Sequence, residues 1–399
     1  MAVTVGTNGT NYILKTLWPQ SRVENLVYPD HPLLAMMPKD EKFYGENMYL
    51  AVRGVDTQGR SAAFSTAAAA AGSHNGKRFL LTRVSDYQVC VLSTEAILAS
   101  KSDKGALIKH LDTEIESGMN NIGKSLAVSL YRGKSGVIGR VGSVSGGVIT
   151  LSNVNDVTSF EVGMVLNANP TLTGTSGDMR SGDGTISAVD RDAGTVTYTG
   201  TISSIAANDY LYPKGDYDAK ISGLADWLPT TAPTSALFFG VDRSSDPTRY
   251  AGLRLDVSSL NPEEACVTAL SRLGREGAGP KHLFVNHLDY RNIGISLGSK
   301  VEYESLEVGD IGFQAIKLHG PKGAVSVIAD QDCPAGTGYA LDLSKWKLYS
   351  LEKCPQVLDL DGNRLLRVSD ADNWQARIAY FAQLGTTAPG HNGVLTMPT

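Results

Sequence analysis

The sequence has little of the chemistry that catalytic and metal-binding sites use. Its 399 residues include four cysteines and seven histidines, with no CxxC pair, no HExxH motif and no Gly-x-Ser-x-Gly turn. Wide separation of the cysteines predicts buried free thiols; they are Cys90, Cys266, Cys333 and Cys354. We therefore predict that the chain is not an enzyme and has no catalytic, cofactor-binding or metal-binding residues.

Runs of positive charge and long apolar runs are also missing. The formal net charge is −5, and no block of five or six Lys or Arg residues occurs, which argues against tight or sequence-specific DNA binding. No stretch approaches the roughly 20 apolar residues of a membrane helix. The first residues, Met1–Gly6, lack the charged start of a secretory signal. We expect a reducing cytoplasm and no membrane contact.

Glycine and apolar residues, in contrast, are abundant. With 42 glycines and 42% hydrophobic residues, the composition is that of a globular chain rich in β-structure, divided into two or three compact units. The first segment, 1–40, is interrupted by prolines and indicates an extended arm. This arm carries apolar residues such as Trp18 and Leu34, so we expect a neighbouring subunit to cover it.

The segment 41–92 predicts an extended hairpin. Two β-like stretches, Asn47–Gly54 and Phe79–Leu92, flank small residues that include five consecutive alanines. An alanine run can be helical, but its glycine and serine borders favour a long hairpin with a mobile tip. A lone hairpin is not stable, and no cover for it is evident in the same chain, so we expect it to need a partner surface.

The segment 93–133 predicts a long helix. From Thr94 to Arg132, apolar residues recur at spacings of three and four on one stripe; they are Leu107, Leu111, Ile115, Met119, Ile122, Leu126 and Leu130. Three glycines, Gly105, Gly118 and Gly123, weaken this helix, which must therefore gain its stability from packing along its length.

Gly118–Ser125 matches the phosphate-loop pattern letter for letter. That pattern binds phosphate only as a loop between a strand and a helix, where free backbone amides converge on the anion. Here Met119, Ile122 and Leu126 continue the helical stripe, so the amides would be used in helical hydrogen bonds. We predict that the match is coincidental and that Lys124 is an exposed helix residue.

An all-β module is predicted over 134–216. Two hairpins are indicated by alternating residues on either side of Gly146-Gly147 and of Asp192–Gly194. Further strands are predicted at Phe160–Leu166 and Asp209–Tyr212, and the Thr/Gly/Ser-rich Asn167–Gly184 predicts an exposed loop.

Helices and strands alternate through the rest of the chain. Polar loops are predicted at Pro229–Ser235 and Asp242–Arg249, and Asn261 followed by Pro262 and two glutamates predicts a helix start. We further predict strands at His282–Val285, Ile316–Leu318, Val325–Ile328 and Tyr339–Leu343, a helix at Leu288–Leu297, and a long strand from Asp372 to Leu384.

The order of these segments resembles that of tailed-phage major capsid proteins with the Hong Kong ninety-seven fold. The resemblance rests on Gly336–Asp342, on Val285–Asp289 before a short helix, and on Trp374–Phe381 near the end. It implies an α+β capsid fold with an N-terminal arm (1–40), an extended hairpin loop (41–92), the spine helix of a peripheral domain (93–133), an inserted β domain (134–216), an axial domain with connecting peripheral segments (217–350) and a C-terminal return to the peripheral domain (351–399).

The resemblance also implies a function. It predicts a coat protein that self-assembles as hexamers and pentamers into the icosahedral head around the double-stranded DNA of a tailed bacteriophage, located in the virion after assembly in the host bacterial cytoplasm. Implied partners are further copies of the chain, a separate scaffolding protein, a portal and a decoration protein. The resemblance does not extend to covalent cross-linking, and Lys77 on the hairpin is interpreted as a solubilising charge.

Two other functions remain as alternatives. One is a phosphate-loop nucleotide hydrolase that uses Gly118–Ser125. The other is a glycan-binding adhesin built on the 134–216 module. Asp359–Asn363 resembles part of a calcium loop but lacks its bidentate glutamate, which favours a β-turn.

Overall fold

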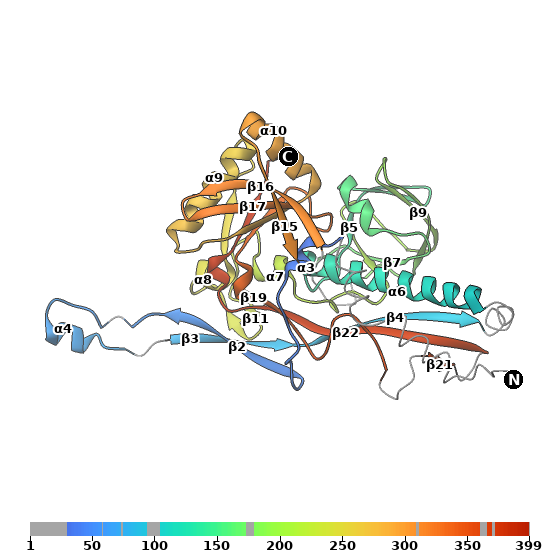
Figure 1. Ribbon diagram of the computed structural model, residues 1–399, viewed down its shortest axis with the longest axis horizontal. Coiled ribbons are helices and arrows are strands. Elements are labelled where there is room, and N and C mark those ends of the chain that lie inside the picture. The colour runs from blue at the N-terminus through green and yellow to red at the C-terminus, as the bar shows by residue number, and fades with distance from the viewer. Residues whose placement is uncertain are drawn as a thin grey trace.

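The computed structural model describes residues 30–57, 59–72, 75–93, 104–172, 179–308, 311–359, 365–368 and 372–398. Their strands form a six-stranded sheet, a closed barrel, a seven-stranded sheet and two two-stranded sheets. In Figure 1 the barrel and the seven-stranded sheet stand as two lobes above a long lower layer, and a hairpin extends from one end of that layer.

The six-stranded sheet is the lower layer. Its strands are β1 (Lys39–Asp40), β4 (Val84–Ser93), β19 (Trp346–Ser350), β20 (Gln356–Val357), β21 (Leu365–Arg367) and β22 (Asn373–Thr386). The central strand β22 pairs antiparallel with β4, β19, β20 and β21, and β1 adds in parallel to the edge at β19. The long strand predicted from Asp372 is thus confirmed as β22.

Helix α6 (Lys104–Arg132) lies along one face of this sheet (Figure 1). The described part of its predicted apolar stripe is buried, which confirms the helical spacing; these residues are Ile115, Met119, Ile122, Leu126 and Leu130. The predicted start of the helix at Thr94 cannot be compared with the structure, because residues 94–103 lie outside the described part of the chain. A Cβ atom at Gly118 would come within 2.3 Å of Cys90 Sγ on β4, so this glycine allows the close approach of helix and sheet.

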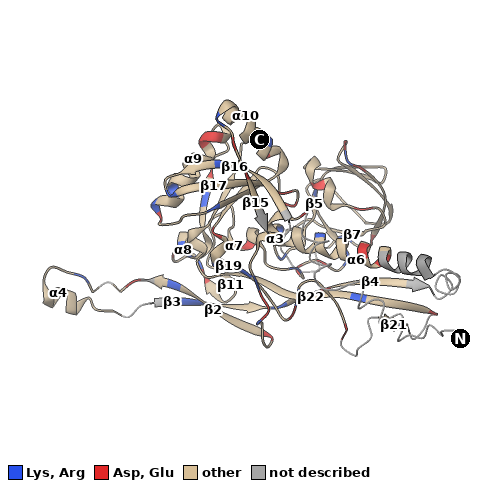
Figure 2. Ribbon diagram, in the orientation of Figure 1, with Lys and Arg blue, Asp and Glu red and all other residues tan. Residues whose placement is uncertain are grey.

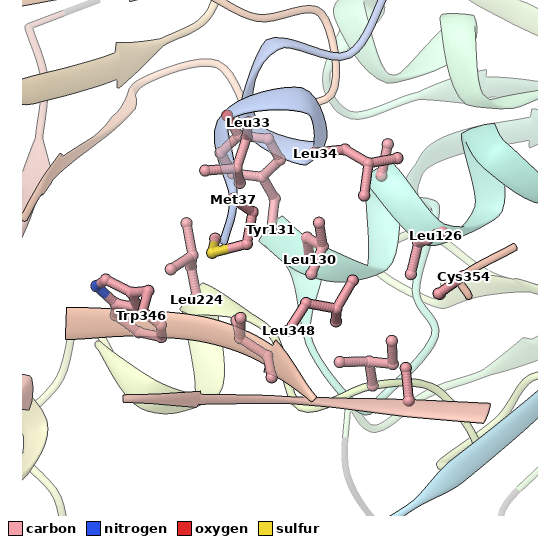
Figure 3. Close-up of a cluster of buried hydrophobic side chains, with 14 of the residues drawn as sticks. Leu33, Leu34, Met37, Leu126, Leu130, Tyr131, Leu224, Trp346, Leu348 and Cys354 are labelled. Atoms are coloured by element: carbon pink, nitrogen blue, oxygen red, sulfur yellow. The ribbon is translucent and has the colours of Figure 1, made fainter. Parts of the chain in front are cut away.

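The end of the predicted arm packs on its own chain. Residues 1–29 lie outside the described part, but Pro32–Met36 forms the short helix α3, with proline in its first turn. Leu33, Leu34 and Met37 are buried and point toward α6 and β19 in Figure 3. The expectation of an extended chain is therefore wrong for residues 32–36, because a proline that cannot enter a helix interior can still begin a helix. The expectation of cover by a neighbour is also wrong here, because the same chain covers these apolar residues.

The hairpin consists of β2 (Asn47–Val55) and β3 (Asn75–Thr82), which pair antiparallel. Two corrections apply. Its end was predicted at Leu92, but β4 belongs to the six-stranded sheet, and the alanine run forms part of the helix α4 (Phe64–Ala69). The base is also covered by its own chain: Leu50, Val52, Phe79 and Leu81 are buried, and the Phe79 ring centroid lies 5.1 Å from that of Trp227.

The strands between Gly139 and Pro213 close into a six-stranded barrel in the order β10-β5-β6-β9-β8-β7. They are β5 (Gly139–Ser145), β6 (Val148–Leu151), β7 (Val165–Asn169), β8 (Gly184–Asp190), β9 (Thr195–Gly200) and β10 (Tyr210–Pro213). The two predicted hairpins and the predicted strand at Asp209–Tyr212 are confirmed. The strand predicted at Phe160–Leu166 begins only at Val165, and a 3-10 helix (Val154–Ser159) instead brings Phe160 into the barrel core.

The exposed loop predicted at Asn167–Gly184 begins too early. Asn167 and Asn169 were assigned to an exposed loop, but both lie in β7 and are buried. Their polarity suggested a loop, whereas Asn167 instead donates hydrogen bonds from its side-chain amide to Asp183 Oδ1 at 2.7 Å and to the Gly182 carbonyl at 3.2 Å.

The seven-stranded sheet has the order β13-β23-β18-β14-β17-β16-β15. Its strands are β13 (Leu253–Asp256), β14 (His282–Val285), β15 (Glu302–Val308), β16 (Ile311–Gly320), β17 (Gly323–Ala329), β18 (Thr337–Leu341) and β23 (Gly393–Thr396). Helices α9 (Pro262–Arg275) and α10 (His287–Leu297) pack on it. The predicted helices and strands are confirmed here, although the Asn261 side chain makes no capping hydrogen bond.

The chain end contributes to two sheets. Residues 351–399 were predicted as one return to the peripheral domain, and β22 of this segment lies in the six-stranded sheet. Strand β23 lies inside the seven-stranded sheet, parallel to β13 and antiparallel to β18. The C-terminal segment therefore connects the lower layer to this lobe.

Short elements complete the connections: α7 (Leu224–Trp227), β11 (Leu237–Phe238), β12 (Val241–Asp242), α8 (Pro247–Ala251) and 3-10 turns at Gly298–Lys300, Leu343–Lys345 and Pro389–His391. The predicted polar loop at Asp242–Arg249 contains the start of α8, where the Asp246 carboxylate accepts from the Arg249 amide at 3.1 Å. The predicted turn at Asp359–Asn363 lies mostly outside the described residues.

Candidate assembly surfaces

The phosphate-loop match lies within α6. Gly118–Ser125 is helical throughout, so its amides do not converge on an anion site. Its polar residues make ties between elements: Lys124 Nζ lies 2.9 Å from Glu161 Oε1 of the barrel, and Ser125 Oγ donates to Asp86 Oδ2 of β4 at 2.9 Å. Lys124 is therefore partly buried and paired rather than free and exposed.

A charged junction joins the barrel to the lower layer. Lys220 Nζ, on the segment that leaves the barrel, lies 2.5 Å from Asp86 Oδ2 and 3.1 Å from Asp216 Oδ2. Tyr380 of β22 also donates to Asp86, at 3.1 Å. Burial raises the pKa of Asp216, against the opposing effect of Lys220. The lysine thus pairs with two carboxylates and ties the exit of the barrel to β4 and α6.

The described side chains offer no site for a metal or a reactive thiol. They contain no group of three or more His, Cys, Asp or Glu residues placed to hold a metal ion. All four cysteines are buried thiols outside any disulfide, as predicted. Burial raises the pKa of Cys90 to about 11 and of Cys266 and Cys354 to about 12, with nearby charges as secondary causes, which keeps these thiols protonated and unreactive near neutral pH. Across the described chain, no helix is both long and apolar enough for a membrane span.

Among the described residues, the hairpin tip is a first exposed apolar surface. From residue 61 to residue 72 the chain has no charged side chain, and every residue of α4 is at least partly exposed. Phe64, at the start of α4, is 88% exposed. Chain sections nearer the body are basic, with Arg60, Lys77 and Arg78. An uncharged, aromatic tip on a basic stalk is costly to leave in water and suits contact with another surface.

The second apolar surface is the face of β4 that points away from α6. Alternation along the strand turns Cys90 toward the helix and Tyr87, Val89 and Val91 outward, where they are 57%, 46% and 53% exposed. The Tyr87 ring meets Phe381 of β22 edge to face, with centroids 5.7 Å apart. We call Tyr87, Val89 and Val91 the outer face of β4.

The two surfaces cannot meet within one chain. In Figure 1 the hairpin tip with α4 lies at one end of the long axis, and β4 runs toward the opposite end. Figure 2 shows Lys and Arg on the hairpin strands and Asp and Glu on the described part of α6, above β4. The molecule therefore carries two exposed apolar surfaces at its two ends.

Sequence reasoning located the hairpin but missed the outer face of β4. The alternation in Val84–Leu92 was visible, but it was interpreted as part of the hairpin. Lys220 was missed as well, because a single lysine in a loop gives no sequence signal of its two distant carboxylate partners.

Comparison with known proteins adds the following findings. No family model matches the sequence, and no curated protein matches it. Similar solved structures include the capsid asymmetric unit of cyanophage A-1(L), with 13% identity, a TM-score of 0.49 and coverage of 93% of both chains. Two others are the capsid of the native GTA particle (9% identity, TM-score 0.45, covering 93% of this chain and 91% of that one) and the holo-SrpI encapsulin complex of Synechococcus elongatus (9%, 0.45, 96% and 94%). Phage capsids are thus among the structures similar to this chain, as the resemblance in the sequence led us to expect.

Proposed function

We propose that this chain is a capsid shell protein that assembles by laying the hairpin tip of one copy on the outer face of β4 of the next copy. The observation that carries the proposal is the pair of exposed apolar surfaces at opposite ends of one molecule. A contact between two different patches on identical copies is heterologous, and it forms a closed ring where the rotation from one copy to the next closes. Such rings are the capsomers of a shell.

Charge does not decide the pairing. Arg60, Lys77 and Arg78 flank the uncharged tip, and the exposed Arg377 of β22, which pairs with Val89, lies on the same face as the outer face of β4. Glu114 and Glu116 lie on α6, on the other side of the sheet, so the proposed contact rests on its apolar residues. The formal net charge of −5 also suits a shell that encloses DNA without binding its phosphates tightly.

In finer detail, we propose the major capsid protein of a tailed bacteriophage, arranged as hexamers and pentamers in an icosahedral head around double-stranded DNA. The proposed division is an arm (1–40), a hairpin loop (47–82), a peripheral domain built on α6 and the six-stranded sheet, an inserted β domain (134–216), and an axial domain built on the seven-stranded sheet. Its location would be the virion after assembly in the host bacterial cytoplasm, with scaffolding, portal and decoration proteins as partners and no enzymatic role.

The two alternatives have less support. A nucleotide hydrolase needs a loop at Gly118–Ser125, where the chain is helical. A glycan-binding adhesin needs an open binding site on the barrel, but the barrel interior is filled by its own apolar side chains. Neither alternative accounts for the exposed hairpin tip.

The test is a comparison of two charge insertions in the full chain. Phe64→Asp places a charge on the hairpin tip, where it touches none of the chain's own core, so the subunit should fold normally and fail to assemble. Val162→Asp is the matched control: Val162 is also an exposed apolar residue, 65% accessible, but lies on the barrel. Sedimentation velocity and electron microscopy should show shells or capsomers for the wild type and Val162→Asp only.

Two results would contradict the proposal. One is a wild-type chain that stays a folded monomer across concentration, salt and added scaffolding protein. The other is assembly of Phe64→Asp as efficient as that of the wild type.

A further inference from the structure

The end of the arm is held by a buried cluster of ionisable groups that we call the arm clasp: His31, Tyr131, Asp330 and Asp332. His31 Nδ1 lies 2.5 Å from Asp332 Oδ2. Asp330 Oδ2 accepts from the Leu33 amide at 3.1 Å and from the Tyr131 hydroxyl at 2.8 Å. All four side chains are nearly inaccessible. The clasp therefore joins α3 to α6 and to the loop that follows β17.

Charge in the clasp is unbalanced. Two carboxylates share a buried site, and the Asp332 amide donates to Asp330 Oδ1 at 3.0 Å, which holds them close together. Asp30 adds a third carboxylate on the arm. The group that can supply a positive charge in direct contact with these carboxylates is His31, which is a cation only when it is protonated. Two adjacent buried carboxylates are not both stable as anions unless protons or cations compensate them.

The cations nearby are occupied elsewhere. Arg132 of α6 pairs with Asp156 at 2.5 Å. Lys124 and Arg191 line the same small cavity as His31 and Asp332, but both are paired with Glu161, at 2.9 and 3.2 Å. Cys333, next along the loop, is a protonated thiol. Lys124, Arg191 and the single Glu161 leave one positive charge in that cavity, but among the described residues no Lys or Arg forms an ion pair with Asp330 or Asp332. Direct compensation within the clasp therefore comes from protons.

We propose that the arm clasp is a proton-dependent anchor that holds residues 30–37 on the body more firmly at mildly acidic pH than at alkaline pH. In the protonated clasp, His31 is a cation between carboxylates, and one carboxylate is neutral. When the protons leave, two anions face a neutral imidazole in a nearly inaccessible site. The resulting repulsion is relieved if α3 and His31 move away and water enters.

The pKa shifts of the clasp groups support firmer anchoring at lower pH. Burial, followed by the charge of Asp332, raises the pKa of Asp330 to about 7. Burial lowers the pKa of His31, but its hydrogen bond to Asp332 and the charges of Asp332, Asp330 and Asp30 outweigh burial and raise it. A group whose pKa is raised in the closed state favours that state below its ordinary pKa and loses this contribution as the pH rises to the shifted value. For Asp330 the loss extends from about pH 4 to about pH 7, and His31 extends it above its ordinary pKa of 6.5.

The anchor would act on the region where the chain enters the body. Strand β1 (Lys39–Asp40) comes shortly after α3 in the chain and pairs with β19. Release of the clasp would therefore free residues 30–37, while β1 would remain paired with β19. The device goes beyond shell formation, and it operates in a single subunit whether or not the chain assembles.

The experiment is hydrogen exchange of the full-length subunit, measured by mass spectrometry from pH 5 to pH 8 and corrected for the intrinsic rate at each pH. Peptides that contain the Leu33 and Met37 amides should lose at least about tenfold in protection over this range. Peptides from α9, which carries no group of the clasp, should change much less.

Variants separate the clasp from general pH effects. Asp330→Asn removes the ionisable group and keeps an acceptor oxygen for Leu33 and Tyr131, so the pH dependence at residues 30–37 should fall to within about threefold. Asp289→Asn is the matched control, because Asp289 is also buried, has a raised pKa and accepts from a backbone amide, that of Gly336. It should retain the wild-type pH dependence at residues 30–37.

A second variant covers the case in which Asp330→Asn does not fold. Asp332→Asn removes the charge that raises the pKa of both Asp330 and His31, and it should also reduce the pH dependence by at least threefold. The proposal is overturned if wild-type protection at residues 30–37 is flat from pH 5 to pH 8, or if the folded variants keep the wild-type slope.

Discussion

Gly118 decides at the scale of one residue how α6 approaches the sheet. A Cβ atom there would lie 2.3 Å from Cys90 Sγ and 2.9 Å from Ile378 Cδ1. Gly118→Ala should therefore destabilise the chain by about 1–3 kcal/mol through overpacking, despite the better helix propensity of alanine. Gly274→Ala in α9 is the control, because its nearest neighbours are 3.8 Å away, and it should stabilise by about 0.5–1 kcal/mol. Urea denaturation should show a lower free energy of unfolding for Gly118→Ala and a higher one for Gly274→Ala than for the wild type. Equal changes in the two variants would contradict the overpacking at Gly118.

Substitutions of Lys220 and of Lys124 should change the free energy of unfolding by different amounts. Lys220 is buried between Asp86 and Asp216, so Lys220→Met leaves two uncompensated carboxylates and should cost about 3–5 kcal/mol. Lys124 is more exposed, and its pair with Glu161 is worth at most about 1 kcal/mol. Lys124→Ala should therefore change stability little and leave assembly intact. ATP hydrolysis that the wild type shows and Lys124→Ala lacks would instead restore the nucleotide-site alternative.

Residue patterns in the sequence predicted local structure well where local forces decide it. The stripe on α6 and the glycine turns of the barrel follow from periodicity and from backbone preferences, and both are present. The partners of Lys220 and of His31 were not predictable, because His31 and Asp332 are separated by 301 positions. Only the folded chain brings such groups together.

Among the elements, the hairpin should be the first site of proteolysis. Arg60 lies in the exposed stretch before α4, whereas Lys77 and Arg78 lie in β3, where pairing with β2 protects the backbone. Trypsin should therefore cut unassembled subunits at Arg60 before Lys77 or Arg78, because cleavage needs local unfolding. Assembly should suppress the cut. Equal rates in shells and free subunits would show that the hairpin tip contacts no neighbour.

The barrel should fold as an element of its own. Its strands close on themselves, and its apolar core draws on α6 only through Val128. Expressed alone, Lys134–Asp216 should give a cooperative melting transition with the circular dichroism of β-structure. Ile149→Asp, which places a charge in that core, should abolish the transition and serves as the negative control. A disordered wild-type fragment would mean that the barrel depends on α6.

The boundaries of elements were less predictable than the elements themselves. Strand β4 has the same β-forming composition as the hairpin strands, so nothing local showed that it pairs with β22, almost 300 residues later. The strand at the chain end was not predicted either, since β23 is only four residues long and its partners are distant in sequence. In both cases long-range pairing, which leaves little trace in local composition, fixed the architecture.

At the scale of the whole molecule, the direction of the proposed contact can be tested by mixing variants. Phe64→Asp has a damaged hairpin tip and an intact outer face of β4. Val89→Asp has an intact tip and a damaged outer face. In a heterologous contact each variant alone should remain monomeric, because every contact needs one tip and one face. A mixture can form a single good contact, between the tip of Val89→Asp and the face of Phe64→Asp.

That single contact cannot propagate. The free tip of the resulting pair carries Phe64→Asp, and its free face carries Val89→Asp, so growth stops at two subunits. Sedimentation equilibrium of the equimolar mixture should therefore show heterodimers and no rings, while each variant alone shows monomers. Rings or shells in the mixture would mean that the tip and the outer face of β4 are not partners, and shells formed by Val89→Asp alone would assign the tip to a different surface of the neighbouring copy.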